Sequence, residues 1–224
     1  MGDINQLIFI RDRLRQFNGP FLEVGSKDYG TTQDLRSLFS AKDEYIGIDM
    51  ESGPGVDIVL DITSDFQQID NKLGDRRFGT IFCLSVLEHC DDPFKMADNL
   101  TSLLKPNGQI LISVPFTWQI HGYPNDYWRF TPEGIKKLFT GIQFDMGKSL
   151  ASTSKQNEFY QIDDDLGKIS FSFKKNRAKG HLLRGVSAKI LKMFSRIGVL
   201  SWLTGYRHVF SPTGFFMIGE LKEK

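Results

Sequence analysis

Short apolar segments alternate along this chain with segments of helical periodicity, and this alternation constrains the fold more than any other feature. The apolar runs cover residues 21–24, 45–49, 57–61, 80–85 and 109–114. Apolar residues recur at helical spacing over 4–17, 32–40, 64–73 and 93–104. Short strands that are apolar throughout and joined by helices are typical of a parallel sheet covered on both faces.

The second half of the chain extends this pattern. A helix is expected over 132–139, and further strands over 142–150 and 214–218. Right-handed crossovers between parallel strands then produce a doubly wound, Rossmann-like, mostly parallel α/β sheet with helices on both faces. Ligands bind such sheets beyond the carboxyl ends of the strands. We therefore expect the functional residues directly after each strand.

Residues 151–212 interrupt the alternation and divide the chain. We predict a Rossmann-like main domain over 1–150, an insertion or basic helical arm over 151–212, and the last strand of the main sheet with a tail over 213–224. No Asp or Glu occurs between Leu166 and Gly219, where ten Lys and Arg residues occur. Since the chain holds 28 basic and 27 acidic residues, the remainder has 18 basic and 27 acidic side chains. The near-neutral total therefore conceals a strongly basic arm.

The arm over 166–210 has the pattern of a basic amphipathic helix. One helical face holds Val186, Ile190, Met193, Phe194 and Ile197, and another holds Lys189, Lys192 and Arg196, with Trp202 and Tyr206 following. Anionic membrane surfaces attract such helices, with about 1 kcal/mol for each cation near the surface. Docking on the inner membrane face is one hypothesis, and packing on the protein's own domain is the other. Nucleic acid is a third partner class, but no recognised RNA- or DNA-binding signature accompanies the basic residues.

The composition limits where in the cell the protein is expected and whether it is expected to bind a metal. The two cysteines, Cys83 and Cys90, form neither a disulfide framework nor a zinc-binding spacing, so no metal is expected. The start of the chain lacks a basic segment followed by an apolar one, and no window approaches about 20 apolar residues. We expect a cytoplasmic protein.

The segment Leu22 to Gly30 places an acid before a glycine turn. Gly25 allows the turn to bring backbone amides close to a ligand. The segment resembles the first motif of the S-adenosylmethionine-dependent methyltransferases. This resemblance implies that Glu23, Gly25, Ser26 and Lys27 surround the methionine part of the cofactor. The sequence departs from the motif at Lys27, where a second glycine is expected.

Two acids that end the following strands extend this resemblance. Asp49 closes the second strand, where an acid can accept hydrogen bonds from both ribose hydroxyls. In the family, the position of Asp61 contacts the adenine amino group, and Met50 and Ile62 would line the base pocket. The alternative is that both acids cap local turns, which is common for Asp.

The loop after the fourth strand carries the most specific resemblance. Leu87-Glu88-His89, followed by Asp92-Pro93 and Lys105-Pro106-Asn107-Gly108, recurs in a subgroup of class I small-molecule methyltransferases, the methyltransferase type 11-like proteins. The match runs from about residue 20 to residue 140. It implies S-adenosylmethionine as the cofactor and contacts from Leu84 and Ser85. An NAD-dependent oxidoreductase is the enzymatic rival, but the Gly-x-Gly-x-x-Gly fingerprint is absent. A scaffold that binds the cofactor without turnover is the other alternative.

Two histidines are candidates for proton removal from an acceptor. His89 has the chemistry of a general base near neutral pH, and His121 is the second candidate. An aromatic segment after the fifth strand would form the acceptor wall, with His121, Tyr127, Trp128 and Arg129 as its binding residues. The alternatives are that His89 caps its loop and that Arg129 pairs with Asp126. Similar Asp-Tyr-Trp-Arg-Phe-Thr-Pro runs occur in relatives linked to glycan or lipid biosynthesis. We therefore predict O- or N-methylation of a small-molecule or lipid- or glycan-linked acceptor, with the oligomeric state left open.

Overall fold

The structure is a computed structural model that describes residues 3–30, 34–122, 125–164, 166–167, 172–178, 180–194 and 211–222. The chain divides into two compact units. The first comprises Met1–Ile162 and Thr213–Lys224, and the second comprises Asp163–Pro212. Each unit is described by itself below.

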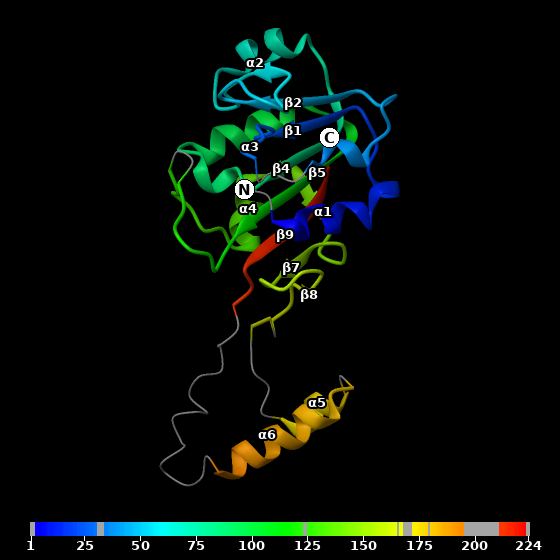
Figure 1. Ribbon diagram of the computed structural model, residues 1–224, viewed down its shortest axis with the longest axis vertical. Coiled ribbons are helices and arrows are strands. Elements are labelled where there is room, and N and C mark those ends of the chain that lie inside the picture. The colour runs from blue at the N-terminus through cyan, green and yellow to red at the C-terminus, as the bar shows by residue number, and fades with distance from the viewer. Residues whose placement is uncertain are drawn as a thin grey trace. The chain divides into compact units, whose positions relative to one another are not determined.

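The first unit is built on one mixed sheet (Figure 1). Its strands are β1 (Phe21–Val24), β2 (Tyr45–Asp49), β3 (Ile58–Val59), β4 (Phe78–Leu84), β5 (Leu104–Pro115), β6 (Ile142–Phe144), β7 (Leu150–Ser152), β8 (Phe159–Gln161) and β9 (Gly214–Leu221). They run in the order β3-β2-β1-β4-β5-β9-β7-β8, and β6 also pairs with β9. The pairs from β3 to β5 are parallel, whereas β9 is antiparallel to β5. This arrangement confirms the predicted α/β fold with a mostly parallel sheet.

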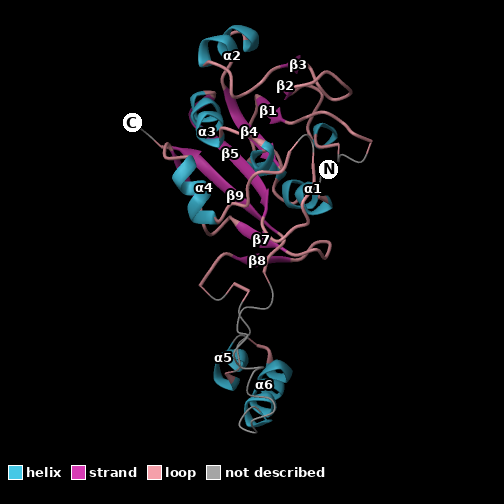
Figure 2. Ribbon diagram, turned by 90° about the vertical axis from the view of Figure 1, so that its left-hand side faces the viewer, coloured by secondary structure: helices cyan, strands magenta, loops and turns pink. Residues whose placement is uncertain are grey.

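Helices cover both faces of this sheet because its strands alternate apolar side chains between the two faces. On one face, Phe9 of α1 (Ile4–Arg11) stacks on Phe216 of β9 with ring centroids 4.8 Å apart. Phe82 and Leu111 belong to the same buried cluster. Figure 2 shows α3 (Pro93–Ser102) and α4 (Pro132–Leu138) on the opposite side from α1.

The helix ends follow local capping rules. Asp92 accepts a hydrogen bond from the Lys95 amide at 3.0 Å and Pro93 begins α3, while Thr131 caps α4 in the same way. The helix α2 (Phe66–Leu73) ends at Gly74, which adopts the left-handed conformation that favours glycine. Two short 3-10 helices, η1 (Leu14–Gln16) and η2 (Arg36–Leu38), complete the first 40 residues.

Several predicted elements are shorter than the periodicity indicated. The helix predicted over 4–17 is divided into α1 and η1, and the strand predicted over 57–61 is reduced to β3. The helix predicted over 32–40 is reduced, within the described residues, to η2. The strand predicted over 142–150 is two strands, β6 and β7, separated by a turn in which Asp145 accepts from the amides of Gly147 and Lys148. Hydrogen bonds of this side chain to nearby amides favour a turn over a continuous strand.

The insertion predicted over 151–212 begins later, because β7 and β8 are part of the main sheet through pairing with β9 and with each other. The second unit begins at Asp163 and contains α5 (Phe173–Ala178) and α6 (Leu182–Phe194). Ile197, Trp202 and Tyr206 of the predicted arm lie outside the described residues. Among the described helices, none has the length and apolar composition needed to cross a bilayer.

Candidate functional site

A cavity of about 730 Å³ lies at the carboxyl ends of the parallel strands. Twelve of the residues predicted for the site line it. They are Glu23, Gly25, Lys27, Asp49, Met50, Asp61, Ile62, Leu84, Ser85, His89, His121 and Tyr127. The strand ends of a parallel sheet meet at one edge, so residues far apart in sequence share this cavity.

The glycine turn after β1 leaves no room for a side chain. Gly25 has φ +73°, and a Cβ added to it would lie 2.5 Å from Cγ2 of Val86. The amides of Gly25 and Ser26 both donate to the Ile48 carbonyl, at 2.9 and 3.1 Å, which fixes the turn against β2. Only glycine fits both the conformation and the space at this position.

Glu23 lies beneath this turn with a tyrosine as its partner. The hydroxyl of Tyr45 donates to Oε2 of Glu23 at 2.7 Å. Burial raises the pKa of Glu23 to about 7, and the Tyr45 hydrogen bond opposes this shift only in part. The site therefore holds a carboxyl group that a bound cationic group, such as an ammonium, would hold ionised.

Asp49 and Asp61 each form a local turn and also line the cavity. Asp49 accepts from the Glu51 amide at 3.0 Å and from the Lys27 amide at 3.3 Å. Asp61 accepts from the amide and hydroxyl of Thr63 at 2.8 and 2.7 Å. Each of these acids therefore caps a local turn and also lies at the cavity as predicted. Both are possible because a carboxylate can accept several hydrogen bonds.

Three predicted site residues lie outside the cavity lining. The Ser26 hydroxyl is buried where a Cβ on Gly47 would meet it at 2.6 Å. Arg129 forms a two-point ion pair with Asp126, whose side chain is 2% exposed, and donates further to the carbonyls of Trp128 and Gln119. The Trp128 indole donates to the Cys90 carbonyl at 2.7 Å. The side chains of Arg129 and Trp128 are thus occupied by partners within the protein, and the Asp126 pairing considered from sequence is the one present, whereas the buried Ser26 hydroxyl has no hydrogen-bond partner among the described residues.

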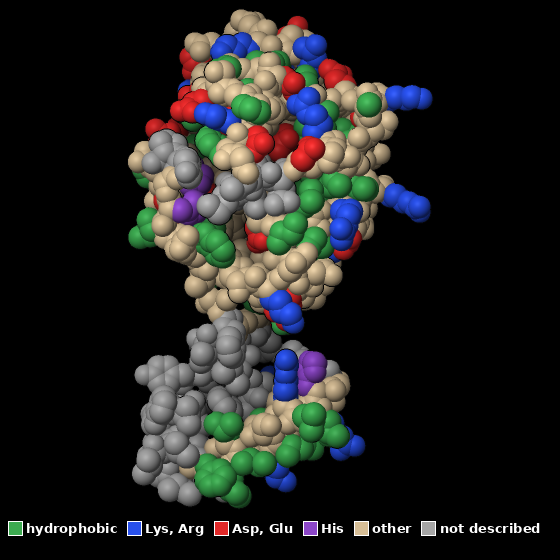
Figure 3. Space-filling view, viewed as in Figure 1, with side chains coloured by type: hydrophobic (Ala, Val, Ile, Leu, Met, Phe, Trp, Pro, Cys, Tyr) green, Lys and Arg blue, Asp and Glu red, His purple; other side chains and the backbone are tan. Residues whose placement is uncertain are grey.

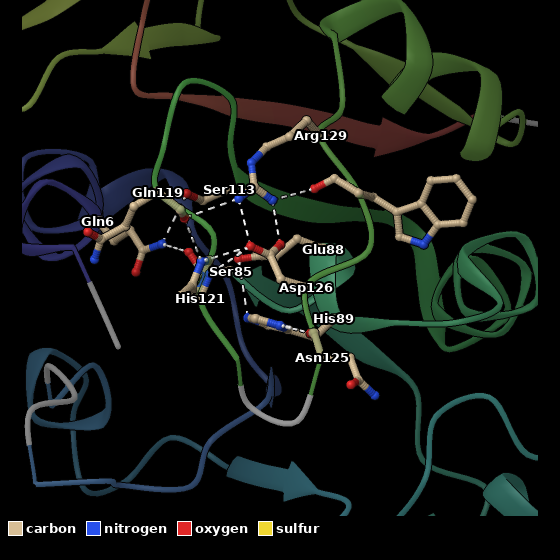
Figure 4. A network of polar contacts seen from close by, with 11 residues as sticks. Gln6, Ser85, Glu88, His89, Ser113, Gln119, His121, Asn125, Asp126 and Arg129 are labelled. Carbon is tan, nitrogen blue, oxygen red and sulfur yellow. Dashed lines mark hydrogen bonds and ion pairs between the residues drawn. The ribbon is translucent and has the colours of Figure 1, made fainter.

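The two histidines face each other at the cavity (Figure 4). Their ring centroids are 4.9 Å apart and nearly perpendicular. His89 belongs to η3 (Leu87–His89), and its Nδ1 contacts the Asn125 carbonyl oxygen. A carbonyl can only accept, so Nδ1 carries the proton and Nε2 the lone pair. Burial lowers the pKa of His89 and favours its neutral form.

His121 is oriented by the loop that follows β5. Its Nδ1 lies 3.2 Å from Oδ2 of Asp126, and its amide donates to the same oxygen at 2.9 Å. The loop is held against η3 because the amides of Tyr127 and Trp128 both donate to the Glu88 carbonyl, at 2.8 and 3.2 Å. Backbone hydrogen bonds between distant segments therefore bring the two histidines together.

The sequence reasoning missed the contribution of α1. Gln6, Leu7 and Ile10 line the cavity. Gln6 is buried and donates to the hydroxyls of Ser85 at 2.7 Å and Ser113 at 3.1 Å. Ser85 has φ +54°, a conformation uncommon outside glycine. In the sequence, the one indication of the contact between Gln6 and Ser85 is a glutamine among the apolar residues of the helix predicted over 4–17.

Comparison with known proteins agrees with this geometry. The chain matches the family model described as a methyltransferase domain over residues 10–161. Among curated proteins, no sequence match was found.

Solved structures share the fold at low sequence identity. A SAM-dependent methyltransferase from Archaeoglobus fulgidus has a TM-score of 0.53 at 14% identity, with 96% of this chain and 94% of that chain covered. The 1,6-didemethyltoxoflavin-N1-methyltransferase of Burkholderia thailandensis, bound to 1,6-didemethyltoxoflavin and S-adenosylhomocysteine, has 0.55 at 11% identity, with 99% and 79% covered. A glycopeptide N-methyltransferase complexed with S-adenosylhomocysteine has 0.52 at 11% identity, with 99% and 91% covered.

The residues of the cavity fit an adenosyl cofactor. The turn at Gly25 exposes backbone close to the cavity, Asp49 and Asp61 offer carboxylate acceptors at successive strand ends, and Met50 and Ile62 supply apolar surface. The chain belongs to the methyltransferase domain family and is a class I methyltransferase that uses S-adenosylmethionine.

Proposed function

We propose that the enzyme methylates an oxygen or nitrogen of a small-molecule acceptor placed beside His89 and His121. The observation that carries this proposal is the order of the strands. Asp61 and Gly25 follow β3 and β1, and Asp49 is the last residue of β2, whereas His89 and His121 follow β4 and β5. The carboxylates and the imidazoles therefore belong to opposite halves of the parallel sheet, while all five residues line one cavity.

In this proposal the first half of the sheet holds the cofactor. Asp49 accepts from the ribose hydroxyls and Asp61 from the adenine, with Met50 and Ile62 against the ring, while Glu23 faces the ammonium group. S-adenosylmethionine supplies an activated methyl group on a sulfonium, so the protein mainly has to align the acceptor and exclude water. The remaining predicted contacts come from the backbone of Lys27, Leu84 and Ser85.

His89 is the proposed proton acceptor. Its Nδ1 is committed to the Asn125 carbonyl, which leaves Nε2 with a lone pair. A hydroxyl acceptor placed at Nε2 would lose its proton to the ring as its oxygen attacks the methyl carbon, and an ammonium acceptor would lose a proton there before its nitrogen attacks. His121 and Tyr127 line the same region and would orient the acceptor.

The second unit supports a lipid-linked acceptor. On α6, the side chains of Leu182, Val186, Ile190 and Met193 fall on one stripe, and each is more than 40% exposed. Figure 3 shows hydrophobic side chains gathered on this helix, with basic side chains beside them. Gly185 and Ala188, which are buried, lie on a different face of α6. We propose that the stripe enters the cytoplasmic face of an anionic membrane and that the enzyme is peripheral there.

Ligand-dependent unfolding and product formation test the proposal together. S-adenosylhomocysteine is expected to raise the melting temperature, by an amount that grows with the logarithm of its concentration once the site is saturated, whereas NAD is not. Purified enzyme is then incubated with radiolabelled S-adenosylmethionine and fractionated small-molecule or glycolipid extracts, and labelled product is identified by mass spectrometry. Stabilisation without product from any extract would favour the scaffold alternative. The absence of stabilisation would contradict cofactor binding at this cavity.

A further inference from the structure

Three side chains near the cavity form a donor set that methyl transfer from a sulfonium does not require. Glu88, His89 and His121 each offer one ligand atom, and these atoms lie within 4.8 Å of one another. Glu88 and His89 come from η3, and His121 comes from the loop after β5 (Figure 4). The group combines two imidazoles with one carboxylate.

Glu88 has a buried carboxyl group without a hydrogen-bond partner. Its side chain is 0% exposed, and among the described residues neither Oε1 nor Oε2 has a hydrogen-bond partner. Nε2 of His89 lies 3.7 Å from Oε1 of Glu88, beyond hydrogen-bond distance. A buried polar group left without a partner is destabilising, and more so if it is charged, so this side chain requires an explanation.

The imidazoles have the outer contacts typical of metal ligands. A metal-binding histidine usually donates its second N–H to a carbonyl or a carboxylate, which fixes the ring. Nδ1 of His89 contacts the Asn125 carbonyl, and Nδ1 of His121 lies 3.2 Å from both the Gln119 carbonyl and Oδ2 of Asp126. Asp126 is in turn held by Arg129. These contacts leave Nε2 of each ring with its lone pair.

We propose that Glu88, His89 and His121 bind a divalent transition-metal cation. Two imidazoles and one carboxylate are the donor set that zinc and iron(II) accept, with further positions open to water or substrate. Donor atoms of a tetrahedral zinc site lie about 3.3 Å apart at bond lengths near 2.0 Å. The 3.7 Å between Glu88 and His89 would therefore need only a small contraction. The cation also supplies the partner that the buried carboxylate lacks.

The role of the cation in activating the acceptor rests on the proposed function, whereas binding of the cation does not. An acceptor hydroxyl bound to the cation has a lowered pKa and loses its proton to solvent. Its oxygen then forms a bond to the methyl carbon while the bond from that carbon to sulfur breaks, leaving neutral S-adenosylhomocysteine. With the cation bound, Nε2 of His89 is a ligand, and the cation replaces it in activating the acceptor.

Calorimetric titration of the full chain tests the site without measuring activity. After treatment with a chelator, the protein is titrated with Zn²⁺ and, separately, with Mg²⁺. One equivalent of Zn²⁺ is expected to bind, with Mg²⁺ much weaker because it prefers oxygen ligands. Glu88→Gln and His121→Gln are each expected to weaken Zn²⁺ binding at least tenfold. The control His181→Asn removes an exposed histidine outside the donor set and is expected to bind like the wild type.

Absence of stoichiometric Zn²⁺ binding to the wild type, or unchanged binding by Glu88→Gln, would overturn the proposal. If either variant fails to fold, the absorption spectrum of the wild type loaded with Co²⁺ decides. Bands without thiolate charge transfer support nitrogen and oxygen ligands, whereas a thiolate band assigns the ion to Cys90 and refutes the site. Stabilisation by S-adenosylhomocysteine is measured in parallel. Stabilisation without Zn²⁺ binding rejects the metal site alone, and Zn²⁺ binding without stabilisation rejects the proposed cofactor arrangement at this cavity alone.

Discussion

The hydroxyl of Tyr45 donates a hydrogen bond of 2.7 Å to Oε2 of Glu23, across the neighbouring strands β2 and β1. Burial nevertheless raises the pKa of Glu23 from 4.5 to about 7. The folded state therefore keeps a proton that the unfolded chain loses at lower pH. The resulting stabilisation is fully present below pH 4.5 and is lost as the pH rises through about 7. The shift corresponds to about 3 kcal/mol of unfolding free energy.

Glu23→Gln is accordingly expected to remove most of this pH dependence in the cofactor-free protein. Urea unfolding at pH 5 and pH 8 measures it, since the variant should lose less stability between these values than the wild type, keeping only the loss that other buried carboxyl groups such as Glu88 contribute. Tyr45→Phe removes a hydrogen-bond donor that favours the ionised form of Glu23. This variant should therefore lose more stability between pH 5 and pH 8 than the wild type loses. Equal slopes for the wild type and Glu23→Gln would contradict this assignment.

Gly25 and Gly30 provide a matched pair of glycine substitutions. Both have positive φ, +73° and +82°, but a Cβ on Gly25 would lie 2.5 Å from Val86, whereas one on Gly30 would have nothing within 4 Å. Gly30→Ala should cost about 1 kcal/mol of stability from backbone strain and keep cofactor binding. Gly25→Ala should reduce the affinity for S-adenosylhomocysteine at least tenfold, because the turn must move. Calorimetry measures both, and Val86→Ala should partly rescue Gly25→Ala if the clash is responsible.

The ion pair of Arg129 with Asp126 should be worth far more than an exposed pair of similar spacing. The Asp126 side chain is 2% exposed, so Arg129→Met leaves a buried carboxylate without its cation, at a cost of about 3 kcal/mol. Lys136→Met breaks the exposed pair with Glu133, whose side chain is 80% exposed, and should change stability by less than about 0.5 kcal/mol. Chemical denaturation of the two variants measures the difference. Similar effects in both would show that the buried pair does not hold the loop after β5.

Val186→Glu tests the membrane stripe of α6. Val186 lies at the centre of the stripe, and the neighbouring Ser187 lies off it and is exposed. Both substitutions add the same charge, so they weaken electrostatic attraction equally, but only Val186→Glu disrupts the apolar contact. Co-sedimentation with vesicles containing anionic lipid should fall several-fold for Val186→Glu and much less for Ser187→Glu. An equal loss of vesicle binding in both variants would mean that charge alone drives binding. The absence of binding by the wild type at low salt would contradict the proposal that α6 binds membranes.

Strand ends were predictable because their chemistry is local. A run of apolar residues ending in Gly25, Asp49 or Asp61 indicates where each strand stops, and a parallel sheet places these stops at one edge. The strands β7 and β8 were less predictable, because they form through pairing with β9 and with each other. Residues 150–152 and 159–161 carry no strong strand pattern, yet both strands are part of the sheet to which β9 belongs.

The sequence alone indicated the α/β fold and the position of Asp49 and Asp61 at strand ends, because these depend on periodicity and on turns within a few residues, and its resemblance to known motifs indicated the methyltransferase family. Only the tertiary structure decided which loop residues reach the cavity. Gln6 lines it through hydrogen bonds to Ser85 and Ser113, far away in sequence. His121 reaches it because the amides of Tyr127 and Trp128 hold the loop after β5 against the Glu88 carbonyl, while Arg129 is paired with Asp126 of the same loop. The direction of such side chains is decided by the partners that satisfy the side chain or its loop, and the partners on other elements cannot be found from local sequence.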